Sequence, residues 1–96
     1  PAATDLIPKK MDVERTIAAL QSVHTALQTA EWTHDGIEAA LRGAAEQLGL
    51  KPGQVFPAVR VAITGRVPAP GIFETVQHIG RAWVLERIER AVGLLT

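Results

Sequence analysis

Apolar side chains recur every three or four residues through most of the chain, and this spacing limits what it can fold into. Residues at this spacing lie on one face of an α-helix, whereas a half-buried strand alternates every second residue. No segment of the sequence alternates convincingly. The pattern therefore predicts an all-α protein, an irregular bundle of five to six short helices with short connections. In the first such stretch the inward positions are Val13, Ile17, Leu20, Val23 (or His24) and Leu27.

Helix-capping residues set the expected ends of the first two helices. Asp12 and Thr33 carry side-chain oxygens that can accept a bond from a free first-turn N–H. They predict helices over about 12–30 and 34–48. Gly49 follows at the position where a left-handed C-terminal cap is expected. The inward residues of the second helix are Ile37, Leu41, Ala44 and Leu48.

Prolines and glycines divide the second half of the chain. A third helix is expected from Pro52, which tolerates the first helical position, to Gly65. Within it, Pro57 removes a backbone bond, so we expect a bend there or a break into two pieces. A stiff loop over 64–71 leads to a short helix beginning at Pro70, and a last helix covers about 81–95. The apolar faces are Val55, Phe56, Val59, Ala62 and Ile63, then Ile72, Phe73, Val76 and Ile79, then Leu85, Ile88, Val92 and Leu95.

Residue types limit the chemistry that the chain can perform. It has no cysteine, which excludes disulfides, thiolate metal sites and a cysteine nucleophile and fits a reducing compartment. Its three histidines share no metal-ligand spacing, no glycine-rich phosphate loop occurs, and no apolar run approaches the ~18 residues of a membrane span. We therefore predict no catalytic, cofactor or metal site. Trp32 and Trp83 are interpreted as core or hinge anchors rather than as stacking platforms.

Charge is distributed unevenly although the net charge is zero. Residues 1–49 hold four Lys or Arg against seven Asp or Glu, whereas residues 50–96 hold six against three. Neutrality argues against strong non-specific binding to nucleic acid. Ordinary surface charge explains the asymmetry equally simply. Five of the six cations in the second half are arginine, which suits bidentate contacts with phosphates and base edges.

Arg60 is the most unusual of these arginines because it interrupts the apolar run Val59-Arg60-Val61-Ala62-Ile63. Arg66 follows in the proline-stiffened loop. An arginine held on a helix can fork its donors onto a base or a phosphate, and a rigid loop loses little entropy on docking. A buried structural ion pair and plain turn chemistry would explain the same residues. Both interpretations remain open from the residues alone.

Several short runs, taken in order, resemble the C-terminal anticodon-binding domain of bacterial-type glutamyl-tRNA synthetase. The likeness covers nearly the whole chain and is strongest over 48–91. The runs are Leu50-Lys51-Pro52-Gly53-Gln54, Arg60-Val61-Ala62-Ile63-Thr64-Gly65-Arg66, Pro70-Gly71-Ile72-Phe73-Glu74, Ile79-Gly80-Arg81 and Leu85-Glu86-Arg87-Ile88-Glu89-Arg90-Ala91.

The resemblance implies a helical cage that grips the anticodon end of tRNA(Glu). It implies that residues 1–96 are one domain, a C-terminal fragment of a longer cytoplasmic glutamate–tRNA ligase, as does a sequence beginning at Pro1. ATP, Mg and the ligation chemistry would belong to an N-terminal Rossmann-type domain, whose pattern these residues lack. This chain would then supply tRNA recognition, act beside the synthetase's upstream domains as a monomer, and be inactive alone. The alternative is a small helical protein-interaction or dimerisation module.

The resemblance also implies site residues. The arginine of the R-x-A-x-T-G run is Arg60, and the loop before the next helix contributes Ala69, Pro70 and Ile72 to the anticodon pocket. Ala69 departs from the polar residue of some members, which leaves its backbone to read a base edge. We add Lys51 and Arg66 for their charge and proximity.

Overall fold

The computed structural model describes residues 3–65 and 71–96. These form five α-helices and one 3-10 turn, and no strand occurs within the two described ranges. The all-α prediction is confirmed. The elements are η1 (Ala3–Leu6), α1 (Val13–Thr29), α2 (His34–Gln47), α3 (Pro52–Thr64), α4 (Ile72–Ile79) and α5 (Arg81–Leu95).

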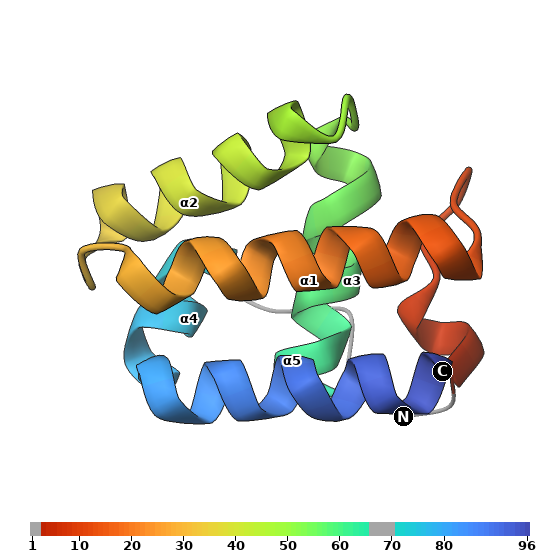
Figure 1. The fold of residues 1–96 in the computed structure, drawn as a ribbon. Helices are drawn as coiled ribbons and strands as arrows, with labels where there is room; N and C mark the ends of the chain where they lie inside the picture. Colours follow the sequence, from red (N-terminus) through yellow and green to blue (C-terminus); the bar gives the residue numbers. More distant parts are fainter. Residues whose placement is uncertain (1–2, 66–70) are drawn as a thin grey trace.

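Helix α1 lies at the centre of the bundle, with α2 along one side and α5 along the other (Figure 1). Helix α3 crosses α1, α2 and α5 and also contacts η1 (Figure 1). The short α4 packs against both α2 and α5. The pair formed by His24 Nε2 on α1 and Glu89 Oε2 on α5, 2.6 Å apart, bridges the two longest neighbours. Buried residues of α3, α4 and α5 belong to the same hydrophobic core.

The expected caps are present. The carboxylate of Asp12 accepts a hydrogen bond from the backbone N–H of Arg15 at 2.8 Å, and the hydroxyl of Thr33 accepts one from Gly36 at 3.0 Å. Gly49 adopts the expected left-handed conformation, with φ of 69°. The boundaries of α1 and α2 therefore follow from local capping chemistry.

Helix α3 is continuous from Pro52 to Thr64, so of the bend or break expected at Pro57 the break is wrong. A proline there costs the helix one backbone bond. Val55, Ala58 and Val59 are buried on both sides of it and hold the helix against the rest of the bundle.

The core is built from Leu, Ile, Val and Ala, as the low aromatic content requires. Most expected inward positions are buried, but Val13 and Leu48 are 41% and 39% exposed because each lies at a helix end, beyond its packing neighbours. On α5 the fully buried positions are Val84, Ile88 and Ala91. This places Trp83 outward at 58% exposure, so its interpretation as a core anchor is wrong, whereas Trp32 packs against the core.

None of the helices in the described ranges combines the length and apolar character that crossing a membrane requires.

Candidate nucleic-acid interface

Arg60 projects from α3 between the buried residues Val59 and Val61, and it is itself only partly exposed. Its Nε is buried and has no hydrogen-bond partner within the described residues. No carboxylate of the described ranges forms an ion pair with it. The structural ion pair that would explain this arginine is therefore absent from that part of the chain. A buried donor without a partner destabilises a fold by about 1–3 kcal/mol, so Arg60 destabilises this one unless another group accepts its hydrogen bond.

The end of α3 continues from Arg60 into the region of the other expected contacts. The Thr64 hydroxyl donates to the Arg60 carbonyl at 2.7 Å, and Gly65 ends the helix with φ of 75°. Arg66, Ala69 and Pro70 lie outside the described residues. Ile72 opens α4 but is only 4% exposed, so its side chain belongs mainly to the core. What it offers a ligand is the first-turn N–H end of α4, where backbone donors lack helical partners.

Lys51 is exposed but lies at the opposite end of α3 from Arg60. Nine residues separate them, about 13 Å along a helix axis. Lys51 borders a shallow hollow with Arg42 and Glu46. The structure therefore does not bring Lys51 together with Arg60.

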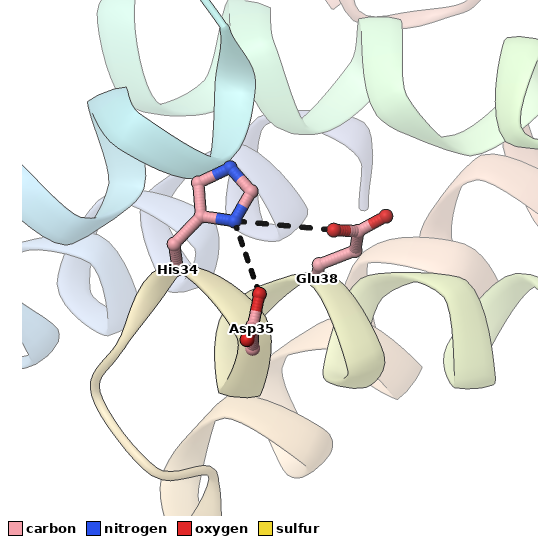
Figure 2. A group of neighbouring side chains, drawn as sticks. All are labelled: His34, Asp35 and Glu38. Atoms are coloured by element: carbon pink, nitrogen blue, oxygen red, sulfur yellow. Dashed lines mark ion pairs between the residues drawn. The ribbon is translucent and has the colours of Figure 1, made fainter.

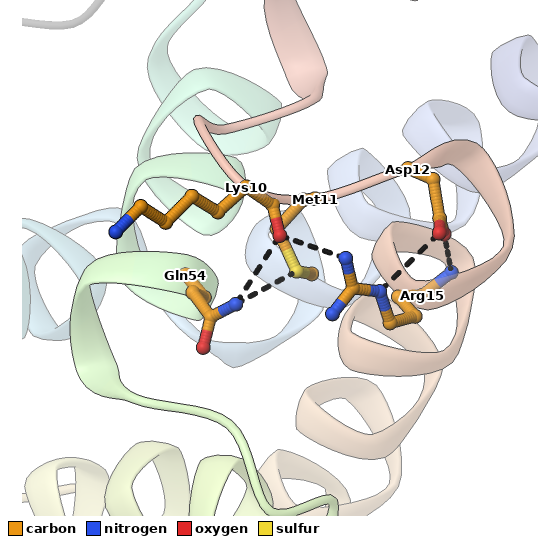
Figure 3. A network of polar contacts seen from close by, with 5 residues as sticks. All are labelled: Lys10, Met11, Asp12, Arg15 and Gln54. Carbon is orange, nitrogen blue, oxygen red and sulfur yellow. Dashed lines mark hydrogen bonds and ion pairs between the residues drawn. The ribbon is translucent and has the colours of Figure 1, made fainter.

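Gln54, three residues after Lys51, has a structural role: Figure 3 shows it within a network of polar contacts with Lys10 and Met11. The Gln54 side chain accepts the Lys51 backbone N–H at 3.0 Å and donates to the Lys10 carbonyl at 3.3 Å. Arg15 Nη2 donates to that same carbonyl at 2.8 Å. Lys10 itself has φ of 64°, an uncommon conformation for a residue with a side chain. These bonds tie the lead-in segment to the starts of α1 and α3.

Arg81 is also structural. Its Nη1 donates to the carbonyls of Gln28 at 2.7 Å and Leu27 at 3.3 Å, and its Nη2 donates to Ala30 at 2.7 Å. Its guanidinium lies 4.9 Å from the centre of the Trp32 ring. A cation at the end of α1 neutralises the carbonyls that the helix leaves without partners. Arg81 thus holds the C-terminal end of α1 and has few donors left for a ligand.

The outward side of α5 was missed as a candidate site. Trp83, Arg87, Arg90 and Leu94 follow one another at intervals of four, three and four residues, so they line one side of the helix. The Arg87 guanidinium lies 5.9 Å from the Trp83 ring, and its Nη1 donates to the Ile63 carbonyl at 2.6 Å. The same spacing argument that located the core would have located these residues.

His34, Asp35 and Glu38 form the one group of potential metal ligands found among the described residues (Figure 2). His34 Nδ1 lies 3.6 Å from Asp35 Oδ1 and 3.9 Å from Glu38 Oε1. Arg42 Nε occupies the other Glu38 oxygen at 2.7 Å. All three ligands come from the exposed start of one helix, where negative charge is favoured without any metal. Ion pairing explains this group fully.

Comparison with known proteins identifies the family. The family model described as "Anticodon binding domain" matches residues 2–92. The chain belongs to this family. The resemblance read from its short sequence runs is therefore confirmed.

Full-length relatives agree with this assignment. The chain is 53% identical over 91 residues to the glutamate–tRNA ligase of Roseiflexus castenholzii, a match covering 94% of the chain and 18% of the relative. It is 48% identical over 92 residues to that of Chloroflexus aurantiacus, covering 95% and 18%. It is 40% identical over 82 residues to that of Thermus thermophilus, covering 84% and 18%. The chain thus spans about a fifth of the length of these ligases.

Proposed function

We propose that the chain recognises the anticodon end of tRNA(Glu) as part of a glutamate–tRNA ligase. In this proposal residues 1–96 form one anticodon-binding domain of a longer cytoplasmic synthetase, and the domain acts as a monomer beside the upstream domains. Those domains bind ATP and Mg and perform the ligation. Family membership and the name shared by the relatives support the proposal.

The observation that carries the proposal is the state of Arg60. Arg60 lies on α3 between two buried residues, yet its own buried Nε has no partner in the described ranges. Unstacked loop bases are the usual targets of sequence-specific RNA recognition, and their edges accept bidentate bonds from arginine. Arg60 is partly exposed, and an anticodon base would bond to the accessible terminal nitrogens of its guanidinium rather than to the buried Nε.

The remaining contacts are proposed around Arg60. Ala69 and Pro70 would line the pocket, the start of α4 at Ile72 would offer backbone donors, and Arg66 would contact a phosphate. Lys51 would act separately, at the far end of α3. With two or three phosphate contacts, log affinity should fall against log salt with a slope of only about −1.5 to −2.

The proposal is tested by NMR titration of the isotope-labelled domain with a tRNA(Glu) anticodon stem-loop, beside a stem-loop with a scrambled anticodon. We expect shifts clustered around Arg60 and the start of α4 with the cognate loop alone. Arg60→Ala should weaken cognate binding by about 1–3 kcal/mol, because a bidentate contact is lost. Arg60→Lys should recover only part of the loss, since an ammonium cannot fork.

Lys9→Ala supplies the matched control, because it removes one exposed positive charge from the segment before α1. It should leave cognate binding within about twofold of the parent, as expected for one screened surface charge. If folded Arg60→Ala bound the cognate loop as tightly as the parent, the central role of Arg60 would be refuted.

A further inference from the structure

The outward side of α5 exposes the largest side chain in the domain. Val84, Ile88 and Ala91 face the core, and the four residues Trp83, Arg87, Arg90 and Leu94, here called the α5 stripe, face away from it. Trp83 is 58% exposed although the chain has only four aromatic residues of the Phe, Trp and Tyr types. A chain so poor in aromatics gains most from burying them, so an exposed tryptophan calls for another explanation.

The two arginines of the stripe present positive charge in a fixed geometry. Arg87 is held by its bond to the Ile63 carbonyl, and no carboxylate within the described ranges pairs with it. Arg90 pairs through Nη2 with Glu86 at 2.8 Å, yet its side chain is 73% exposed. One carboxylate therefore offsets two guanidinium groups on this side of α5, and the Arg87 guanidinium lies beside the indole ring. Arginine beside an exposed aromatic ring is a combination suited to binding unpaired nucleotides.

The stripe adjoins the helix that carries Arg60. A hollow of about 250 Å³ lies between Arg87, Arg90 and Leu94 on one side and the end of α3 on the other. Its α3 wall includes Thr64, which bonds to the Arg60 carbonyl. One RNA loop held at Arg60 would thus lie within reach of the stripe.

We infer that the α5 stripe binds an unpaired nucleotide outside the three anticodon bases, in the same RNA loop. Its base stacks on Trp83, and its phosphate is held by Arg87 and Arg90 across the hollow. This inference rests on the proposed function. Because every base has a stackable face, the contact adds affinity without reading sequence.

A protein occupant fits the stripe less well. Its two apolar residues, Trp83 and Leu94, are eleven positions apart, about 16 Å along a helix. Two arginines lie between them, so the stripe is no continuous apolar patch of the kind that drives protein docking. The charge pattern favours a polyanion with an aromatic component.

The two tryptophan indole N–H signals provide the test. Trp83→Phe removes one of the two signals and so assigns both. The Trp32 indole N–H donates to the Gln77 carbonyl within the fold, so its signal serves as an internal reference. In the parent, the Trp83 signal should shift with both the cognate and the scrambled stem-loop, and the Trp32 signal should stay in place. Trp83→Ala should weaken binding to both RNAs roughly 5- to 150-fold, as loss of one base–aromatic stack does, and leave their ratio unchanged.

Two more variants sharpen the result. Trp83→Phe should recover most of the affinity, since a phenyl ring also stacks. Arg90→Gln should reduce the salt slope by about 0.7, the value for one phosphate on a single strand. Leu48→Ala is the control, because it trims the apolar C-cap residue that follows α2, which is 39% exposed and is not part of the stripe.

The outcomes separate the two proposals. If the parent prefers the cognate loop but Trp83→Ala binds both RNAs as the parent does, the stripe inference is wrong and the anticodon proposal stands. If the parent binds both loops equally and Trp83→Ala loses both, the stripe is supported and anticodon selectivity fails. A Trp83 signal that moves with protein concentration, together with a doubled mass in light scattering, would make the stripe a contact between copies and overturn the inference.

Discussion

Replacing Arg81 tests whether a single side chain holds the C-terminal end of α1. Arg81→Ala removes two hydrogen bonds of 2.7 Å, one of 3.3 Å and a cation–π contact with Trp32 at 4.9 Å. Each short charge-assisted bond contributes about 1 kcal/mol or more, and a partly exposed cation–π contact about 0.5–1 kcal/mol. The freed carbonyls regain water in part, which limits the loss. We expect the free energy of unfolding to fall by about 2–3 kcal/mol.

Urea denaturation followed by circular dichroism measures this change. Thermal unfolding gives a second measurement. For a domain of this size, a change of 1 kcal/mol in the free energy of unfolding shifts the melting temperature by about 4–8 °C, so Arg81→Ala should melt at least ~8 °C below the parent. Arg81→Lys should lie between them, because the ammonium still neutralises the helix end but cannot fork to several carbonyls.

Arg90→Ala is the matched control on the same helix. Its side chain is 73% exposed and makes one i,i+4 pair with Glu86. Such pairs contribute about 0.3–0.5 kcal/mol. If the free energy of unfolding of Arg81→Ala were within ~0.5 kcal/mol of that of the parent, the bonds from Arg81 to the carbonyls would not stabilise the fold. The reasoning from its geometry would then be refuted.

Two further predictions concern stability. A Cβ added at Gly36 would lie 2.2 Å from the Glu31 carbonyl oxygen, whereas one added at Gly43 meets nothing within 4 Å. Gly36→Ala should therefore lower the free energy of unfolding by roughly 1–3 kcal/mol. Gly43→Ala, inside the same helix, should raise it by up to about 1 kcal/mol. Equal effects of the two substitutions in urea denaturation would contradict the predicted clash at Gly36. The hydrogen bond from the Arg15 N–H lowers the pKa of the Asp12 carboxyl below 3.8. The charged Asp12 carboxylate stabilises the fold fully above the pKa that it has in the unfolded chain, and this stabilisation is lost as the pH falls through its lower pKa in the folded protein. The parent should therefore melt at a higher temperature than Asp12→Asn at pH 7, and this difference should fade below about pH 4. A constant difference from pH 7 to 2 would argue against this explanation.

Helix ends were predictable because capping is local chemistry. Asp12, Thr33 and Gly49 each act within four residues of their own position, so the sequence near them contains the whole interaction. Pro57 misled the prediction for the opposite reason. Whether a helix survives a proline depends on packing from α1, α2 and α5, which no local pattern reveals.

The orientation of α5 was harder to predict because its apolar residues cover more than one face. Leu85, Ile88, Val92 and Leu95 were the expected inward side. Ile88 is fully buried and the other three are partly buried against the core, but the remaining buried residues of α5 are Val84 and Ala91. The buried set is centred about 50° around the helix from the expected one, half of the 100° between successive residues. Packing against α1 and α3 decides between them, and that decision determines whether Trp83 faces the core or solvent.

The arginines show why the candidate site was only partly predictable. Arg60 stood out because it interrupts an apolar run, a signal present in its immediate neighbours. Arg81 and Arg87 carry no such signal, since Arg81 bonds carbonyls 51 to 54 residues away and Arg87 bonds one 24 residues away. The fold distinguishes arginines that bind carbonyls at helix ends from Arg60, whose Nε has no partner within residues 3–65 and 71–96.

This distinction bears on how the proposed RNA recognition can be selective in a neutral domain. With zero net charge, the domain has little long-range attraction for a polyanion, so non-specific binding stays weak. Recognition then depends on short-range contacts, and the described residues offer two kinds. Arg60 has a partly exposed guanidinium suited to a base edge, and Trp83 has an exposed ring suited to any base. Selectivity should reside with the first and affinity with the second, so substitutions at Arg60 and Trp83 should change different measured quantities.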